Sequence, residues 1–156
     1  MEEPMPNNNA LQKLVQSSPN FGFLGTDNPK MLRAIISAEC NVFSDPVSAL
    51  IRIRQFAELM CLEVAAINGV YFNKDMGDTF HSICRDLSRR GDIPRNMYDI
   101  FNTLRTAGNE AAHEVEGDKR EALQNLSLAY RLAVWFHETH DRFSKRRPKG
   151  FRPPPP

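Results

Sequence analysis

The sequence predicts an all-α fold, an antiparallel bundle of about five helices. Apolar residues recur at steps of three and four along most of the chain, which is the period of an α-helix that is buried on one face. A proline follows an aspartate or asparagine at the start of two such segments, and this pair is typical of a helix start. The alternating pattern of a strand is almost absent. Because the connections between long helices are short, we expect antiparallel neighbours.

The first two main helices begin at prolines. Asp27-Asn-Pro29 opens a helix that continues to about Phe43, and Asp45-Pro46 opens a more regular helix that ends near Gly69. The second helix carries an apolar seam made of Leu50, Ile53, Ala57, Met60, Val64 and Ile67. A seam of this kind predicts packing against other helices.

Three further helices complete the predicted bundle. One runs from about Thr79 to Arg90 and stops at Gly91, because glycine is favoured directly after a helix end. The next runs from Pro94 to about Glu114. The last begins at the capping-box pattern Asp118-Lys-Arg-Glu121 and continues to about Phe143. Its inner face is predicted to carry Leu123, Leu126, Tyr130, Val134 and His137.

The composition divides the chain into three parts. Residues 1–20 are rich in Asn, Pro, Ser and Gln, and we expect a flexible segment with one short helical turn at Ala10–Gln16. Residues 21–143 form the helical domain, whose first segment, Phe21-Gly-Phe-Leu-Gly25, is expected to tuck its aromatic rings against the core. Residues 144–156 form a basic, proline-rich linker or tail that ends in an extended run of four prolines.

Length and charge exclude several classes of protein. A chain of 156 residues fits one domain, and its net charge of +1 creates no overall field that attracts nucleic acid. No apolar run approaches the roughly 18 residues of a membrane span, and the N-terminus is not a signal peptide, so we expect a cytoplasmic protein with no membrane partner.

Cysteine and histidine residues predict neither a disulfide nor a metal centre. Cys40, Cys61 and Cys84 are odd in number and lie in apolar helical segments, which predicts buried free thiols. His137 and His140 have a spacing that can suit a metal, but no third ligand accompanies them. We therefore expect no metal and no other cofactor.

The segment Arg105-Thr-Ala-Gly-Asn-Glu-Ala-Ala-His113 is the main candidate site. Arg105, Asn109 and His113 are four residues apart, so they share one ridge of the predicted helix. Gly108 lies between them although glycine costs about 1 kcal/mol in a helix interior. The pattern predicts a polar site at which another group closely approaches the backbone.

Three segments together resemble a known domain family: Asp45-Pro-Val-Ser-Ala-Leu-Ile-Arg-Ile-Arg-Gln-Phe-Ala-Glu58, the segment from Arg105 to His113, and Ala129-Tyr-Arg-Leu-Ala-Val-Trp-Phe-His137. The family has no assigned function and is placed at the N-terminus of type I restriction enzyme R subunits and related DEAD/DEAH-box helicase proteins. It is similar to the wider HEPN group of helical bundles in prokaryotic defence systems. The resemblance spans roughly residues 20–143 and implies a HEPN-like bundle.

The resemblance implies two alternative functions. Some HEPN members are metal-independent ribonucleases that use an arginine and a histidine, and others are non-catalytic binding or dimerisation modules. In active members an arginine commonly precedes the asparagine directly, whereas Gly108 stands there in this chain. Arg105 and His113 are also eight residues apart, about 12 Å along a helix.

The predicted function is therefore a non-catalytic N-terminal accessory domain of a restriction R subunit or helicase-type defence protein, mediating protein or nucleic-acid binding. Its expected partners are other regions or subunits of that complex, DNA or RNA, or a second copy of the chain. The alternative is a ribonuclease in which His113 acts as the base while Arg105 and Asn109 orient the phosphate.

Arg54 and Glu58 form a second candidate group, one helical turn apart. A local ion pair is the simpler interpretation. The resemblance also suggests that Glu58 reaches Arg105, Asn109 or His113 and completes a polar network between helices. For Asn109 and His113, a network that fixes the packing is favoured over catalysis.

Two groups of basic residues are candidates for nucleic-acid binding. One lies near the C-terminal end of the helix predicted from Thr79 to Arg90, where positive charge also stabilises the helix, and consists of Arg85, Arg89 and Arg90. The other lies in the tail and consists of Lys145, Arg146, Arg147, Lys149 and Arg152. Such a cluster predicts weak binding with a strong dependence on salt, although a solvated tail is the simpler interpretation.

Overall fold

The computed structural model describes residues 8–25, 27–114, 116–141 and 145–156. Its α-helices are α1 (Asn8–Ser17), α2 (Pro29–Asn41), α3 (Pro46–Ile67), α4 (Phe80–Arg90), α5 (Arg95–Ala111) and α6 (Lys119–His140). Two short 3-10 turns, η1 (Gly22–Leu24) and η2 (Lys74–Met76), complete the regular structure of these residues. With only helices in the described ranges, the all-α prediction is confirmed.

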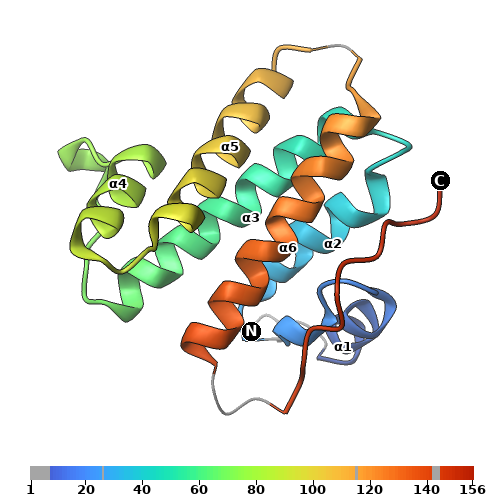
Figure 1. Ribbon diagram of the computed structural model, residues 1–156, viewed down its shortest axis with the longest axis horizontal. Coiled ribbons are helices and arrows are strands. Elements are labelled where there is room, and N and C mark those ends of the chain that lie inside the picture. The colour runs from blue at the N-terminus through green and yellow to red at the C-terminus, as the bar shows by residue number, and fades with distance from the viewer. Residues whose placement is uncertain (1–7, 26, 115, 142–144) are drawn as a thin grey trace, which may run out of the picture.

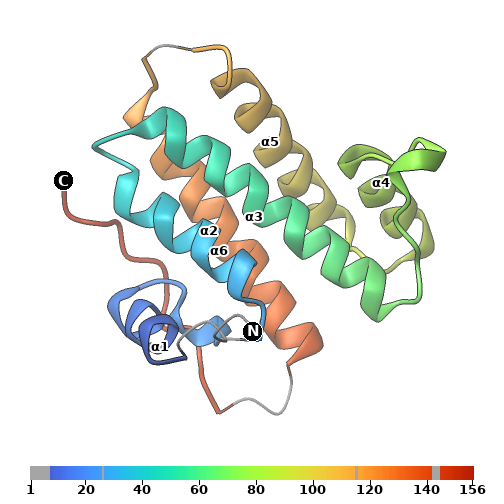
Figure 2. The same ribbon diagram turned by 180° about the vertical axis from the view of Figure 1, so that it is seen from behind.

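Helix α3 is the centre of the bundle, and it packs against α2, α4, α5 and α6. In Figure 1, α6 lies across the front of α2 and α3, while α4 stands at one side, next to the ends of α3 and α5. From behind, α2 and α3 lie in front of α6 (Figure 2). One broad side of the α2–α3 pair therefore faces away from α6.

Side-chain caps explain where several helices begin. The Asn28 side chain accepts a hydrogen bond from the Met31 amide, and the Asp45 side chain accepts one from the Ser48 amide. A proline follows each cap, so both predicted helix starts are confirmed. Hydrogen bonds from Ser48 hold the pKa of Asp45 below its usual range.

Helices α2 and α5 end earlier than predicted. Helix α2 ends at Asn41 and α5 at Ala111, each a turn or less before the predicted end. After α5 the chain continues with tighter backbone bonds, in which the His113 amide donates to the Glu110 carbonyl. Helix α6 ends at His140, and the predicted end at Phe143 lies outside the described residues.

The predicted end of α4 is confirmed. Gly91 follows α4 with a φ of 83°, a conformation that favours glycine.

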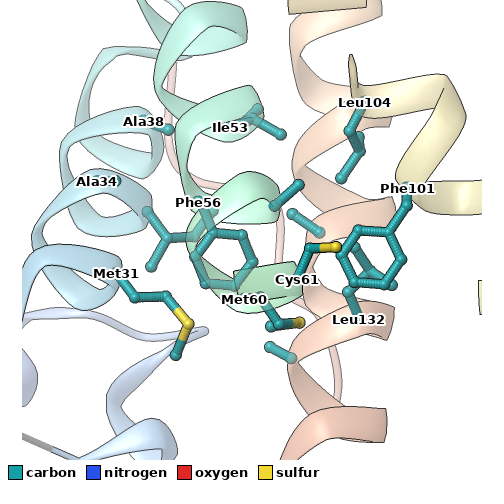
Figure 3. Packing of buried hydrophobic residues seen from close by; sticks show 14 of the residues in the cluster. Met31, Ala34, Ala38, Ile53, Phe56, Met60, Cys61, Phe101, Leu104 and Leu132 are labelled. Atoms are coloured by element: carbon teal, nitrogen blue, oxygen red, sulfur yellow. The ribbon is translucent and has the colours of Figure 1, made fainter. Parts of the chain in front are cut away.

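The core lies where α2, α3, α5 and α6 meet (Figure 3). Phe56 and Met60 of α3 face Met31 of α2, while Phe101 of α5 and Leu132 of α6 close the other side. The predicted apolar seam of α3 is buried from Leu50 to Val64. Ile67 is the exception, because it is the last residue of α3 and is half exposed.

Part of the segment before α2 is helical. The turn expected at Ala10–Gln16 is the ten-residue helix α1, which packs on α2 and η1. Phe21 is fully buried, with its ring 6.0 Å from that of Phe56, so the expected tucking of this loop is confirmed.

The thiol prediction holds for two of the three cysteines. Cys61 and Cys84 are buried, and all three thiols are free. Cys40 is exposed because it lies on the outer side of α2.

Candidate functional site

Gly108 is the point at which α5 lies directly on a side chain of α3. A β-carbon at this position would be 2.8 Å from Cδ and 3.0 Å from Cγ of Arg54, and closer still to its Cβ. The prediction that another group approaches the backbone at Gly108 is confirmed, and that group is the aliphatic stem of Arg54. The glycine is therefore explained by helix packing.

Arg54 connects three helices. Its Nη1 donates to Oε2 of Glu58 at 3.2 Å, and its guanidinium carbon lies 6.0 Å from the centre of the Phe80 ring of α4. Cations at this distance from an aromatic face are attracted to it. Arg54 thus contacts α5 through its stem and α4 through its charge, while the ion pair with Glu58 remains within α3.

The predicted ridge is open to solvent at its end, where His113 lies beyond the last residue of α5. Asn109 and His113 are exposed, and no side-chain hydrogen bond joins either of them to another described residue. Arg105 is half-buried, and its Nε has no hydrogen-bond partner among the described residues. Within the described ranges, the structure brings Arg54 and Glu58 together but does not connect Glu58 to Arg105, Asn109 or His113.

The basic residues of the C-terminal segment gather around one concavity of the surface. We call it the basic pocket. It has a volume of about 460 Å³, and Ser18 and Asn20 line it together with Arg146, Arg147, Lys149 and Arg152. No acidic residue is part of its lining in the described structure. Such a site can bind phosphate groups by charge and by hydrogen bonds.

Hydrogen bonds between the side chains of Asn20 and Tyr130 and its own backbone hold the C-terminal segment on the bundle. Asn20 donates through Nδ2 to the Arg152 carbonyl and accepts through Oδ1 from the Arg152 amide, both at 2.8 Å. The Gly150 amide donates to the Tyr130 hydroxyl at 2.8 Å, and Phe151 packs on the Tyr130 ring. These contacts fix the backbone on one side of Lys149 and keep the positive side chains beside α1.

The buried carboxyl group of Glu39 holds Ser18 and Asn20 in place through hydrogen bonds. Glu39 is 5% exposed; its side chain accepts a hydrogen bond of 2.7 Å from the Ser18 hydroxyl and one of 3.2 Å from the Asn20 amide. Burial raises the pKa of Glu39, and the bonds from Ser18 and Asn20 only partly oppose that rise. Glu39 therefore positions Asn20, which in turn positions Arg152.

The two predicted groups of basic residues lie far apart. Arg85, Arg89 and Arg90 are exposed on α4, on the opposite side of the molecule from the C-terminal segment (Figure 1). Arg90 pairs with Asp92 at 2.8 Å and also donates to the Asn68 carbonyl. The structure therefore does not combine the two groups into one surface. Lys145 is exposed at the start of the basic segment.

The predicted pair of histidines is engaged in packing. His137 is buried, its Nε2 lies 3.0 Å from the Arg146 carbonyl, and its Nδ1 lies 3.5 Å from Asp141. The His140 ring packs on Trp135 and Phe136. Among the described residues, no group of three His, Cys, Asp or Glu side chains is placed to hold a metal ion. Nor is any helix of those residues long and apolar enough to span a membrane.

Comparison with known proteins places the chain in a family. The model of a domain of unknown function (DUF4145) matches residues 37–132. The chain belongs to the DUF4145 family. This confirms the predicted relationship to a family without an assigned function.

One relative of this DUF4145 domain is the "Type I restriction enzyme EcoKI endonuclease subunit" of Escherichia coli (strain K12). The two are 31% identical over 123 residues, which is 79% of this chain. The chain spans only 10% of the length of that relative. No solved structure matches the chain.

The matched part of the DUF4145 domain contains the Arg54–Gly108 contact but not the residues of the basic pocket. Sequence reasoning missed Asn20, which lines that pocket, and Glu39, which accepts a hydrogen bond from Asn20. For Glu39 a signal exists, because it shares the buried face of α2 with Ile35 and Ile36, where a carboxyl group requires partners. Asn20 carries no such signal, since its partner lies 132 residues further along the chain.

Proposed function

We propose that this chain is a non-catalytic accessory domain of a type I restriction or helicase-type enzyme, and that it binds nucleic-acid phosphates in the basic pocket. The similarity to the EcoKI endonuclease subunit supports the association with a restriction system. The basic pocket is the observation that carries the binding function, because four positive side chains line one concave site. The expected partners are nucleic acid and other regions or subunits of the same complex.

Binding through phosphates depends strongly on salt, since each neutralised phosphate releases counterions. We expect labelled single- and double-stranded oligonucleotides to bind the chain at low salt and to dissociate as salt rises. Changing Arg146, Arg147 and Lys149 together to Gln should reduce the slope of log affinity against log salt by up to about 3, because each of these cations neutralises about one phosphate. Fluorescence anisotropy at several salt concentrations measures this slope.

The matched control removes three positive charges elsewhere, by changing Lys74, Arg95 and Arg131 to Gln. All three side chains are exposed and lie outside the basic pocket. If the control lowers the affinity and the slope as much as the pocket variant does, only net charge matters. The basic pocket would then not be the binding site.

The competing function is a metal-independent ribonuclease, for which the open position of His113 and Asn109 is the specific observation. An exposed imidazole is accessible to RNA, but no described side chain orients it. For an accessory domain, we expect no cleavage of a labelled, unstructured RNA without metal. We also expect His113→Ala to change the free energy of unfolding by less than about 0.5 kcal/mol. Cleavage by the wild type that disappears in a folded His113→Ala variant would establish the ribonuclease instead.

A further inference from the structure

We propose that the groove between α2 and α3 is a docking site for an acidic amphipathic helix of a partner protein. The groove is separate from the basic pocket, because the two share no lining residue. Its lining comes from α2 and α3, the two helices that lie in front of α6 in Figure 2. The proposal does not depend on nucleic-acid binding.

The floor of the groove is apolar. Leu59 and Leu62 of α3 and Ala34 of α2 line a concavity of about 570 Å³. Both leucines remain half-buried, because α2, α4, α5 and α6 pack on other sides of α3. Ala34 is small, so the space above it stays open between the two helices. Covering the two leucines would remove further apolar surface from water, which favours binding.

The rim of the groove is positive on both sides. Lys30 and Arg33 project from α2, and Arg52 projects from α3; all three are exposed. Among the described residues, none of them forms an ion pair, and Arg52 hydrogen bonds only to the neutral side chain of Gln55. The acidic residue of the lining, Glu58, is already neutralised by Arg54 at 3.2 Å. The rim therefore lacks negative charge, which the partner can supply.

The shape and chemistry favour a helix over other occupants. A groove between two helices accepts the apolar face of a third helix, with anchors at positions i, i+3 or i+4, and i+7. Carboxylates that flank such a face would meet Arg52 on one side and Lys30 or Arg33 on the other. A nucleic acid fits less well, because single strands bind by stacking on aromatic rings and the residues that line this groove include none.

The test uses the whole chain and a displayed library of helical peptides about 18 residues long, which is about five turns. Binders are selected on the wild type and counter-selected on the double variant Arg33→Glu, Arg52→Glu. We expect the enriched peptides to carry aliphatic residues at helical spacing flanked by Asp and Glu. Synthetic copies should bind the double variant at least about tenfold more weakly, because like charges then face each other.

A matched variant, Arg85→Glu with Arg131→Glu, makes the same change in net charge at exposed sites outside the groove, and it should bind the peptides like the wild type. Leu62→Ala should also weaken binding, with thermal melts confirming that this variant is folded. The proposal is overturned if no peptide is enriched, if the enriched peptides are not acidic helices, or if both charge variants weaken binding equally. It is also overturned if the groove variant reduces oligonucleotide binding more than the matched variant, which would indicate a nucleic-acid surface.

Discussion

At Gly108 the absence of a side chain sets how closely two helices pack. The α5 backbone lies on the stem of Arg54, and that stem continues to Glu58 and to the Phe80 ring. Any side chain at position 108 would move α5 away from α3. Alanine would gain helix propensity of about 1 kcal/mol, but its β-carbon would overlap the stem of Arg54.

We therefore expect Gly108→Ala to lower the free energy of unfolding by about 1–3 kcal/mol, the usual cost of overpacking a close contact. Chemical denaturation measures this loss. Thr106→Ala, at an exposed position of the same helix, is the control and should have almost no effect. In an Arg54→Gly background the cost of Gly108→Ala should disappear, since the overlapping atoms are gone. An equal cost in both backgrounds would mean that Arg54 is not the obstacle.

The second decisive residue is Glu39, a carboxyl group held in the interior. Because burial raises its pKa above the ordinary value of 4.5, the folded protein binds a proton in a pH range where the unfolded chain has released it. This contribution to stability is fully present below pH 4.5 and is lost as the pH rises through the raised pKa.

We expect the free energy of unfolding of the wild type, measured relative to that of Glu39→Gln, to fall as the pH rises from below 4.5 to above the raised pKa of Glu39. The glutamine cannot ionise, so the variant lacks this part of the pH dependence. Denaturation curves of both proteins at a series of pH values give the comparison. Parallel stability profiles would show that Glu39 has the same pKa in the folded and unfolded states.

At the scale of elements, the segment after α6, which we call the strap, links α6 to the turn after α1. It runs from Arg146 to Arg152 and is attached to α6 through His137 and Tyr130 and to the turn after α1 through Asn20. The segment has no helix or strand of its own, so its conformation depends on these side chains. They also shape the basic pocket.

Asn20→Ala should release the end of the strap, because it removes both hydrogen bonds to Arg152. Each such bond contributes about 1 kcal/mol, so we expect the Arg152 amide to exchange with solvent much faster. Hydrogen exchange followed by NMR measures it. Gln124→Ala, at an exposed position of α6, serves as the control. Unchanged protection of Arg152 in Asn20→Ala would show that other contacts hold the strap.

At the scale of the whole molecule, a net charge of +1 conceals a separation of charge. Acidic residues gather where α5 joins α6, namely Glu110, Glu114, Glu116, Asp118 and Glu121, partly offset by Lys119 and Arg120. Partial burial and the neighbouring carboxylates raise the pKa of Glu121. The basic pocket lies near the other end of α6, which has 22 residues and is therefore about 33 Å long.

This polarity gives the proposed nucleic-acid binding a direction. Oligonucleotides should contact the basic end and avoid the acidic one, since like charges repel. When the same oligonucleotides carry a photo-crosslinking group, they should therefore label residues around Lys149 and leave the α5–α6 connection unlabelled. Equal labelling of both ends would show that the charge separation does not orient the ligand.

The sequence by itself determined the helices, most of their starts, the buried seam of α3 and the family. These features follow from local patterns: apolar spacing, prolines after capping residues, and glycine at a helix end. The sequence also predicted a close approach at Gly108, because a glycine in a helix interior lowers the stability of the helix.

Only the tertiary structure decided which group approaches Gly108, that Asn109 and His113 face solvent, and that the basic tail folds back on the chain. These outcomes depend on contacts between residues far apart in sequence. Arg54 and Gly108 belong to different helices, and Asn20 and Arg152 are 132 residues apart. Periodicity shows which face of a helix is buried, but the packing of all the helices together decides what that face meets.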